Sequence, residues 1–171
     1  MVLACLVFGW RWGYRKREAQ AVARAGSYVA AGDFRSAQLT LEQAVQMNPR
    51  NVEARRALAE FYSRLNLPRG LALWQELGAE DPSSDVYALG EAGAALRLKK
   101  YDVADQALAR VSEEGRANAS YKRHRAAVAL AKGDRRELSR QLAELAVLEP
   151  DNLRMRYNAA AAAANNADPA E

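Results

Sequence analysis

The side chains that most often carry out chemistry are scarce in this sequence. Cys5 is the one cysteine and His124 the one histidine among 171 residues. A disulfide needs two cysteines, and a structural zinc site is built mainly from cysteine and histidine ligands, so both are excluded. The same scarcity leaves little room for a catalytic centre of the Ser-His-Asp or Cys-His type.

Carboxylates remain as candidates for acid–base chemistry. Three pairs stand close together in the sequence: Asp102 with Asp105, Glu113 with Glu114, and Glu76 with Glu80. General acid–base catalysis needs a pKa moved towards neutrality, which apolar surroundings produce. The sequence does not offer these pairs such surroundings, so we expect them on solvated helix faces. We therefore predict no catalytic residue, no cofactor and no metal, and a protein that is not an enzyme.

His124 stands within a basic run, between Arg123 and Arg125 and two residues after Lys122. Nearby cations disfavour both the protonation of an imidazole and the binding of a metal cation. We expect His124 to be a groove or surface residue.

The positive charge of the chain is confined to its beginning. Arg11, Arg15, Lys16 and Arg17 account for the whole formal net charge of +4, because 21 basic and 21 acidic residues remain from Glu18 onward. A nucleic-acid surface needs a basic excess on the folded face itself, to displace counterions from the phosphates. We therefore expect no nucleic acid among the partners.

Residues 1–17 join an apolar stretch to this basic cluster. The nine residues from Val2 to Trp10 are too few to cross ~30 Å of hydrocarbon at ~1.5 Å per residue. Trp10, Trp12 and Tyr14 are typical of a membrane interface, and the basic residues follow where headgroups would lie. We predict a partial membrane anchor and hence membrane association, on a side that stays open. The alternative is an apolar tail that packs against the folded chain.

The rest of the chain repeats itself, with a period of roughly 34 residues. Pro82 follows Pro49 by one such period, and Pro150 follows Pro82 by two. Five alanines succeed one another in the same register, one in each period: Ala25, Ala59, Ala92, Ala126 and Ala160. A methyl group at a helix crossing lets two backbones approach closely, where a longer side chain would separate them. The spacing therefore predicts helix pairs that cross at these alanines.

Each repeat reads as two amphipathic helices joined by a short turn. Gly32 permits such a turn and Asp33 can cap the next helix, while Pro68 suits the first turn of a helix because its missing N–H is not needed there. Leu41, Trp74, Leu108 and Leu142 fall on the partner helices. The predicted helices are 18–31, 33–47, 52–65, 68–79, 85–98, 101–113, 118–131, 134–148 and 151–164.

These features resemble the tetratricopeptide repeat (TPR) family. The matching residues are the alanine series, the turns at Gly32-Asp33-Phe34 and Gly133-Asp134, Ala37, Ala44, Ala104 and the terminal prolines. The aromatic residue common near the start of each first helix is absent, and Arg24 and Arg125 stand where leucine is usual. The resemblance implies an all-α, right-handed solenoid of antiparallel helix pairs (a TPR-like superhelix), preceded by a short apolar helical segment. A helical bundle without solenoid stacking is the alternative.

The resemblance also divides the chain. Residues 1–17 are the partial anchor and 18–171 the array, with units at about 18–50, 51–83, 84–117 and 118–151. Residues 152–171 form either a solubilising cap or an incomplete fifth unit.

In this family the first helix of each unit lines a concave surface that holds a peptide or helix of another protein. Transferring the groove positions to this sequence gives the following residues: Arg56, Glu60, Arg64, Leu89, Leu96, Arg97, Arg123, His124, Arg154, Tyr157 and Asn158, with Val22, Val29, Ala30 and Leu130 beside them. Because arginine predominates towards the C-terminal half, we expect an acidic partner segment. The carboxylate clamp of chaperone-binding members is not reproduced at Val22, Gly26, Arg56 and Glu60.

We expect a non-catalytic interaction scaffold, membrane-associated through residues 1–17 and, from its Ala/Arg/Leu-rich composition, bacterial. The alternative is a regulatory or substrate-recruiting fragment of a larger TPR-containing enzyme or assembly factor. The oligomeric state stays open.

Overall fold

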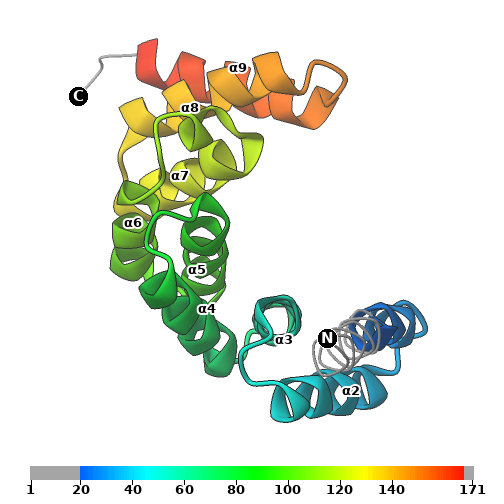
Figure 1. The fold of residues 1–171 in the computed structure, drawn as a ribbon. Coiled ribbons are helices and arrows are strands. Elements are labelled where there is room, and N and C mark those ends of the chain that lie inside the picture. The colour runs from blue at the N-terminus through cyan, green and yellow to red at the C-terminus, as the bar shows by residue number, and fades with distance from the viewer. Residues whose placement is uncertain (1–19, 168–171) are drawn as a thin grey trace, which may run out of the picture.

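The computed structural model describes residues 20–167, and every regular element in that range is helical (Figure 1). The all-α prediction is confirmed for this part of the chain, and the apolar segment and basic cluster of residues 1–17 lie outside it. None of the described helices is long and apolar enough to cross a membrane. Residues 20–30 are helical and are followed by these elements: α2 (Phe34–Met47), α3 (Val52–Arg64), α4 (Pro68–Glu80), α5 (Asp85–Arg97), α6 (Tyr101–Ala109), a 3₁₀ turn (Gly115–Ala117), α7 (Ala119–Lys132), α8 (Arg135–Leu148) and α9 (Leu153–Ala167).

The same left-handed backbone turn joins the two helices of each of the first four units. Gly32, Asn66, Lys99 and Gly133 have φ values of 77°, 56°, 58° and 74°. The residue after each donates its N–H to a carbonyl five residues earlier, as Lys100 does to Ala95 at 2.8 Å. This backbone hydrogen bond satisfies a carbonyl that the end of the helix would otherwise leave without a partner. The turn positions recur with the same period as the alanines, so the repeat read from the sequence is a repeat of backbone geometry.

The alanine series lies where the helices cross. Ala25, Ala59, Ala92 and Ala126 are buried, whereas Ala160 is exposed, because among residues 20–167 no further helix packs on that side of α9. Leu41, Trp74 and Leu108 are buried on the partner helices, as predicted; Leu142 is half-buried. The close-approach argument thus holds for four units and not for the last helix.

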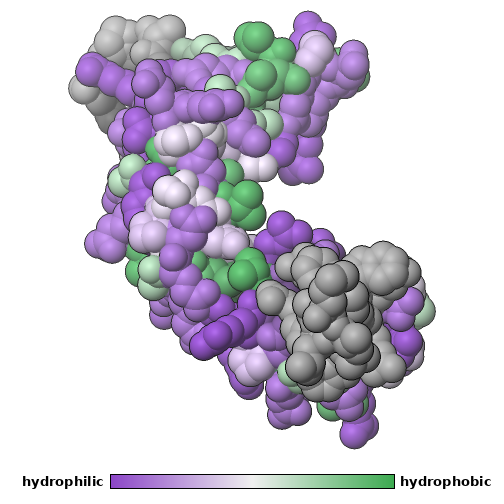
Figure 2. Space-filling view, viewed as in Figure 1, coloured by the Kyte–Doolittle hydropathy of each residue, from purple (hydrophilic) through white to green (hydrophobic). Residues whose placement is uncertain are grey.

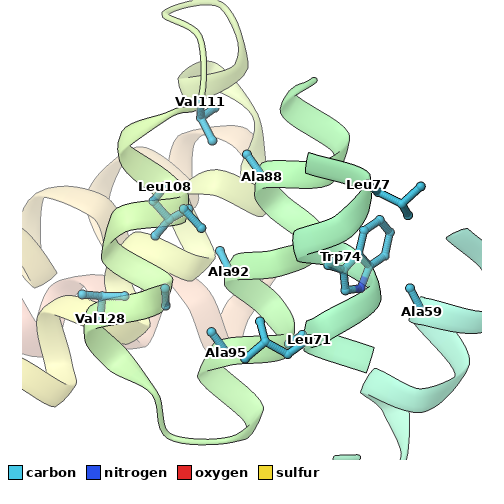
Figure 3. Packing of buried hydrophobic residues seen from close by; sticks show 13 residues of the cluster. Ala59, Leu71, Trp74, Leu77, Ala88, Ala92, Ala95, Leu108, Val111 and Val128 are labelled. Atoms are coloured by element: carbon cyan, nitrogen blue, oxygen red, sulfur yellow. The ribbon is translucent and has the colours of Figure 1, made fainter. Parts of the chain in front are cut away.

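Trp74 fills the space between α4 and α5 (Figure 3). Its indole Nε1 donates to the Ser63 Oγ at 3.2 Å, and that hydroxyl donates to the Ala59 carbonyl at 2.7 Å. Gly90 of α5 lies against the ring, where an added Cβ would come within 2.6 Å of it. Gly70 of α4 leaves similarly little room against α3, because an added Cβ would stand 2.6 Å from the Ser63 backbone nitrogen. Gly90 therefore makes room for the tryptophan, while Gly70 lets α4 approach α3 closely.

The helix pairs stack into an open arc. In Figure 1 the first helices α3, α5 and α7 lie towards the inside of the arc and the second helices α2, α4 and α6 towards the outside. Direct packing of α3 on α5 and of α5 on α7 continues the stack. This is the predicted solenoid of antiparallel helix pairs rather than a bundle around one centre.

The predicted helix 101–113 is too long. The structure ends α6 at Ala109, because Asp85 binds Ser112. Asp85 Oδ1 accepts from the Ser112 backbone N–H at 2.7 Å, and Oδ2 accepts from its hydroxyl at 2.6 Å. These bonds hold the chain in a turn, and a 3₁₀ turn at Gly115–Ala117 leads into α7.

Candidate partner-binding groove

Three groove residues predicted from the second unit share one face of α3. Arg56, Glu60 and Arg64 follow at four-residue spacing, and all three are exposed. Glu60 and Arg64 line a cavity of about 210 Å³, together with Val22 and Val29 of the helical segment 20–30. The structure thus brings Val22 and Val29 together with Glu60 and Arg64, whereas Arg56 and Ala30 do not line this cavity.

The groove residues predicted on α5 divide into two kinds. Leu89 and Leu96 are half-buried and pack against the hydrophobic core, so most of their surface contributes to folding. Arg97, in the last turn of α5, is exposed. Figure 2 shows apolar surface on the inner side of the arc near its middle, bordered by polar side chains. The surface in the middle of the groove is therefore partly apolar, and Arg97 is a single cation beside it.

His124 is more deeply placed than the sequence predicts. Its imidazole lies over Gly93 of α5, with ring atoms 3.3 Å from where a Cβ on that glycine would stand. Its Nδ1 is buried and has no hydrogen-bond partner in the part of the chain that the structure describes. Burial lowers the pKa of His124, and the charges of Arg123 and Arg97 lower it further. The prediction that cationic neighbours lower the pKa of His124 is correct in direction, but burial has the larger effect.

Arg123 differs from the other predicted groove arginines because its guanidinium binds Glu149, at the end of α8. The others make no ion pair with any residue between 20 and 167: Arg56, Arg64, Arg97 and Arg154. Cations that reach towards neighbouring helices are paired, as Arg55 is with Glu80 at 2.7 Å. Adjacent residues Arg55 and Arg56 illustrate the division: one is buried and paired, the other exposed and without an ion pair in the described chain.

The last three predicted groove residues lie on α9. Arg154, Tyr157 and Asn158 are exposed, and the Tyr157 side chain is among the most exposed of the large apolar ones, at 75%. Asn158 borders a cavity between α7, α8 and α9. The one sign of this cavity in the sequence is the polyalanine run of α9, since small residues leave space.

Two of the carboxylate pairs hold helices together. Glu76 and Glu80 both bind Arg55, and Asp102 and Asp105 both bind Lys132. The hydrogen bond from Lys132 and the charge of Arg125 lower the pKa of Asp105, whereas a general acid needs a raised one. Glu113 and Glu114 are exposed. No cluster of three or more potential metal ligands occurs among residues 20–167.

The comparisons with known proteins agree with this geometry. Residues 28–70 match a family model described as tetratricopeptide repeat, and no curated protein matches the sequence. The fold is similar to that of TTC0263, a thermophilic TPR protein of Thermus thermophilus, at a TM-score of 0.70 and 20% identity over 88% of this chain and 83% of that one. A MamA double mutant (RS-1 ArsTM) gives a TM-score of 0.75 at 12% identity over 89% and 86%. A crystal structure of MamA gives 0.70 at 17% over 83% and 84%. Residues 28–70 thus match the tetratricopeptide repeat, and the described chain has the fold of a solved tetratricopeptide-repeat protein.

Proposed function

We propose that this protein is a non-catalytic scaffold that holds an acidic segment of a partner protein on the inner side of the arc. The observation that carries the proposal is the set of arginines that have no ion-pair partner among residues 20–167: Arg56, Arg64, Arg97 and Arg154. Elsewhere the array uses cations to bind its own carboxylates, as at Arg55 and Lys132. A guanidinium on a concave face that binds no carboxylate of its own chain can bind one of another chain through two parallel hydrogen bonds.

A mixed surface supports a protein partner in particular. Val22 and Val29 stand beside Arg64 in the cavity at the first groove end, and half-buried leucines lie near Arg97. A partner segment that alternates acidic and aliphatic residues satisfies both surfaces. Such mixed recognition also fits the formally neutral balance of charge from Glu18 onward, since a polyanion would need a continuous basic face.

The test is selection of peptides by the full chain from a displayed random library. We expect the selected peptides to be rich in Asp and Glu, and the double variant Arg64→Glu/Arg97→Glu to weaken a selected peptide at least about tenfold, because reversal replaces attraction by repulsion. The matched control is Arg35→Glu/Arg136→Glu, which changes the same charge at exposed positions on α2 and α8. Selection of neutral or basic peptides, or equal weakening by both variants, would refute the acidic-partner proposal.

We also propose that residues 1–17 attach the scaffold to a membrane surface, on the strength of their apolar stretch, aromatic residues and basic cluster. The full chain is expected to float with lipid vesicles that contain anionic lipid, and a variant without residues 1–17 to stay in solution. Equal flotation of both would contradict the attachment.

A further inference from the structure

An apolar stripe runs along the outer face of α9, which lies at the C-terminal end of the arc and packs chiefly on α8 (Figure 1). Its members are Leu153, Tyr157, Ala160 and Ala164, and we call them the α9 stripe. They follow one another at steps of four, three and four residues, which places them on one face of a helix. Leu153 and Tyr157 are 73% and 75% exposed, and both alanines are exposed as well. The cavity shared with α7 and α8 lies on another side of α9, where other residues line it.

The repeat indicates which kind of element fits this stripe. Ala160 continues the series of alanines at which the first helix of a unit meets its own partner helix. In the second unit, an added Cβ on Gly70 of α4 would stand 3.0 Å from the Ala59 carbonyl oxygen of α3, so the two backbones cross closely there. That partner helix runs antiparallel to the first helix. Because α9 has no such partner among residues 20–167, its stripe fits an antiparallel helix.

The α9 stripe is complementary in size to a second copy of itself. Its two large side chains, Leu153 and Tyr157, are in the first half of the helix, and Ala160 is at the middle of the fifteen residues. When two copies of α9 pair in antiparallel orientation about Ala160, Tyr157 of each copy lies opposite the small residues around Ala164 of the other. In a parallel pair the two tyrosines would meet instead, and the alanines would leave a gap between the helices.

The charges of α9 favour the same orientation. Its two charged residues, Arg154 and Arg156, are in its first turns, and Asp168 and Glu171 follow the helix in the sequence. The last carbonyls of a helix carry partial negative charge, which attracts cations. An antiparallel pair brings the arginines of each copy towards the C-terminal end of the other helix. A parallel pair would place all four arginines at one end, where they would repel one another.

We propose that two copies of this protein pair through the α9 stripe, in an antiparallel, two-fold symmetric contact centred near Ala160. The contact goes beyond the scaffold function, because it joins two arcs and gives an assembly with two grooves. Tyr157, which the resemblance assigns to the groove, then lies between the copies, while Arg56, Arg64 and Arg97 stay open to a partner. A helix of fifteen residues spans ~22 Å, less than a permanent dimer needs, so the pairing is expected to reverse on dilution.

Sedimentation equilibrium of the full chain over a wide range of concentrations measures the pairing, and the expected result is a monomer–dimer equilibrium. Tyr157→Glu is expected to weaken association at least about tenfold, because it places a carboxylate within an apolar contact. The matched control is Val86→Glu, which makes the same kind of exchange at an apolar side chain on α5 that is 52% exposed, and it is expected to leave association unchanged. Circular dichroism checks that both variants keep the helicity of the wild type.

Cysteine cross-linking tests the orientation, in a Cys5→Ser background because Cys5 is the one native thiol. Ala160→Cys and Ala164→Cys change two exposed alanines of the same stripe. In the antiparallel pair the thiols introduced at position 160 lie close together, whereas those at position 164 are ~12 Å apart along the helices. A disulfide requires Cα atoms within ~7 Å. Ala160→Cys is therefore expected to give a disulfide-linked dimer under mild oxidation, and Ala164→Cys to stay monomeric on a non-reducing gel.

Four results would overturn the inference: a chain that is monomeric at every concentration, equal association of Tyr157→Glu and wild type, equal weakening by Val86→Glu, or cross-linking of Ala164→Cys as readily as of Ala160→Cys. Association that Tyr157→Glu does not weaken would belong to another surface, such as residues 1–17. None of these results bears on peptide binding by the arginine groove, so the two proposals fail separately.

Discussion

Gly90 of α5 packs closely against the Trp74 ring, and this contact makes a quantitative prediction. A Cβ at position 90 would stand 2.6, 2.7 and 2.7 Å from three ring carbons. Ordinary contacts begin near 3.4 Å, so the indole must move by most of an ångström. That movement strains its 3.2 Å hydrogen bond to Ser63.

Gly90→Ala therefore combines two opposing effects. Overpacking costs ~1–3 kcal/mol, and weakening of the buried hydrogen bond adds up to ~1 kcal/mol. Alanine recovers at most ~1 kcal/mol over glycine within a helix. We expect a net loss of ~1–3 kcal/mol in the free energy of unfolding, a shift of roughly 1 M in the urea midpoint for a typical m-value.

Gly26→Ala is the matched control. Gly26 is in the helical segment 20–30, and an added Cβ there meets nothing within 4 Å. The same substitution is expected to stabilise by up to ~1 kcal/mol, the difference in helix propensity. Urea unfolding followed by circular dichroism at 222 nm measures both.

A double-mutant cycle sharpens the test, because Trp74→Leu removes the ring with which the methyl collides. Gly90→Ala in that background is expected to be neutral or stabilising. If Gly90→Ala is harmless beside Trp74, or equally destabilising without it, the contact does not have the role assigned to it.

Three further predictions concern single positions. Arg55→Ala is expected to lower the free energy of unfolding by ~1–3 kcal/mol, because Arg55 is only 8% exposed and its loss removes both packing and two ion pairs. The adjacent Arg56→Ala is expected to change it by no more than ~0.5 kcal/mol, and equal urea midpoints would contradict this. Lys99→Gly is expected to stabilise by ~1 kcal/mol and Gly133→Ala to destabilise by a similar amount, because both positions have positive φ; thermal unfolding checks the opposite signs. Burial lowers the pKa of His124, so the unfolded chain binds a proton at a higher pH than the folded chain does, and stability falls as the pH drops below ~6.5. His124→Asn is expected to reduce the difference between the unfolding free energies measured at about pH 7.5 and about pH 5.5. An unchanged difference would exclude His124 as a source of the pH dependence.

Most of the fold is readable from local pattern, because the residues that end and begin helices act on their own neighbours. Gly32 and Gly133 mark left-handed turns directly, and Asp33 and Asp134 cap the following helices at 3.0 Å. Lys99 adopts the same backbone without glycine, and the period of the repeat is what located it.

The errors come from contacts between distant residues. Asp85 ends α6 through Ser112, 27 residues away, and no local pattern records that bond. His124 is half-buried, and its ring lies over Gly93, a residue without a side chain on another helix. Arg123, a predicted groove cation, binds Glu149 at the end of the next helix, and no local pattern records that pairing. The resemblance assigned the groove positions, whereas the ion pairs of those residues depend on partners elsewhere in the chain.

Because each unit contacts only the units next to it, the packing at each end determines where local unfolding begins. Trp74, Leu77 and Leu108 are the large buried side chains in the middle of the array, while α9 packs chiefly on α8 and carries a run of alanines. Fraying should therefore start at the α9 edge and stop where the large side chains begin, so a protease would trim the array from that edge inward and leave the tryptophan-centred portion intact.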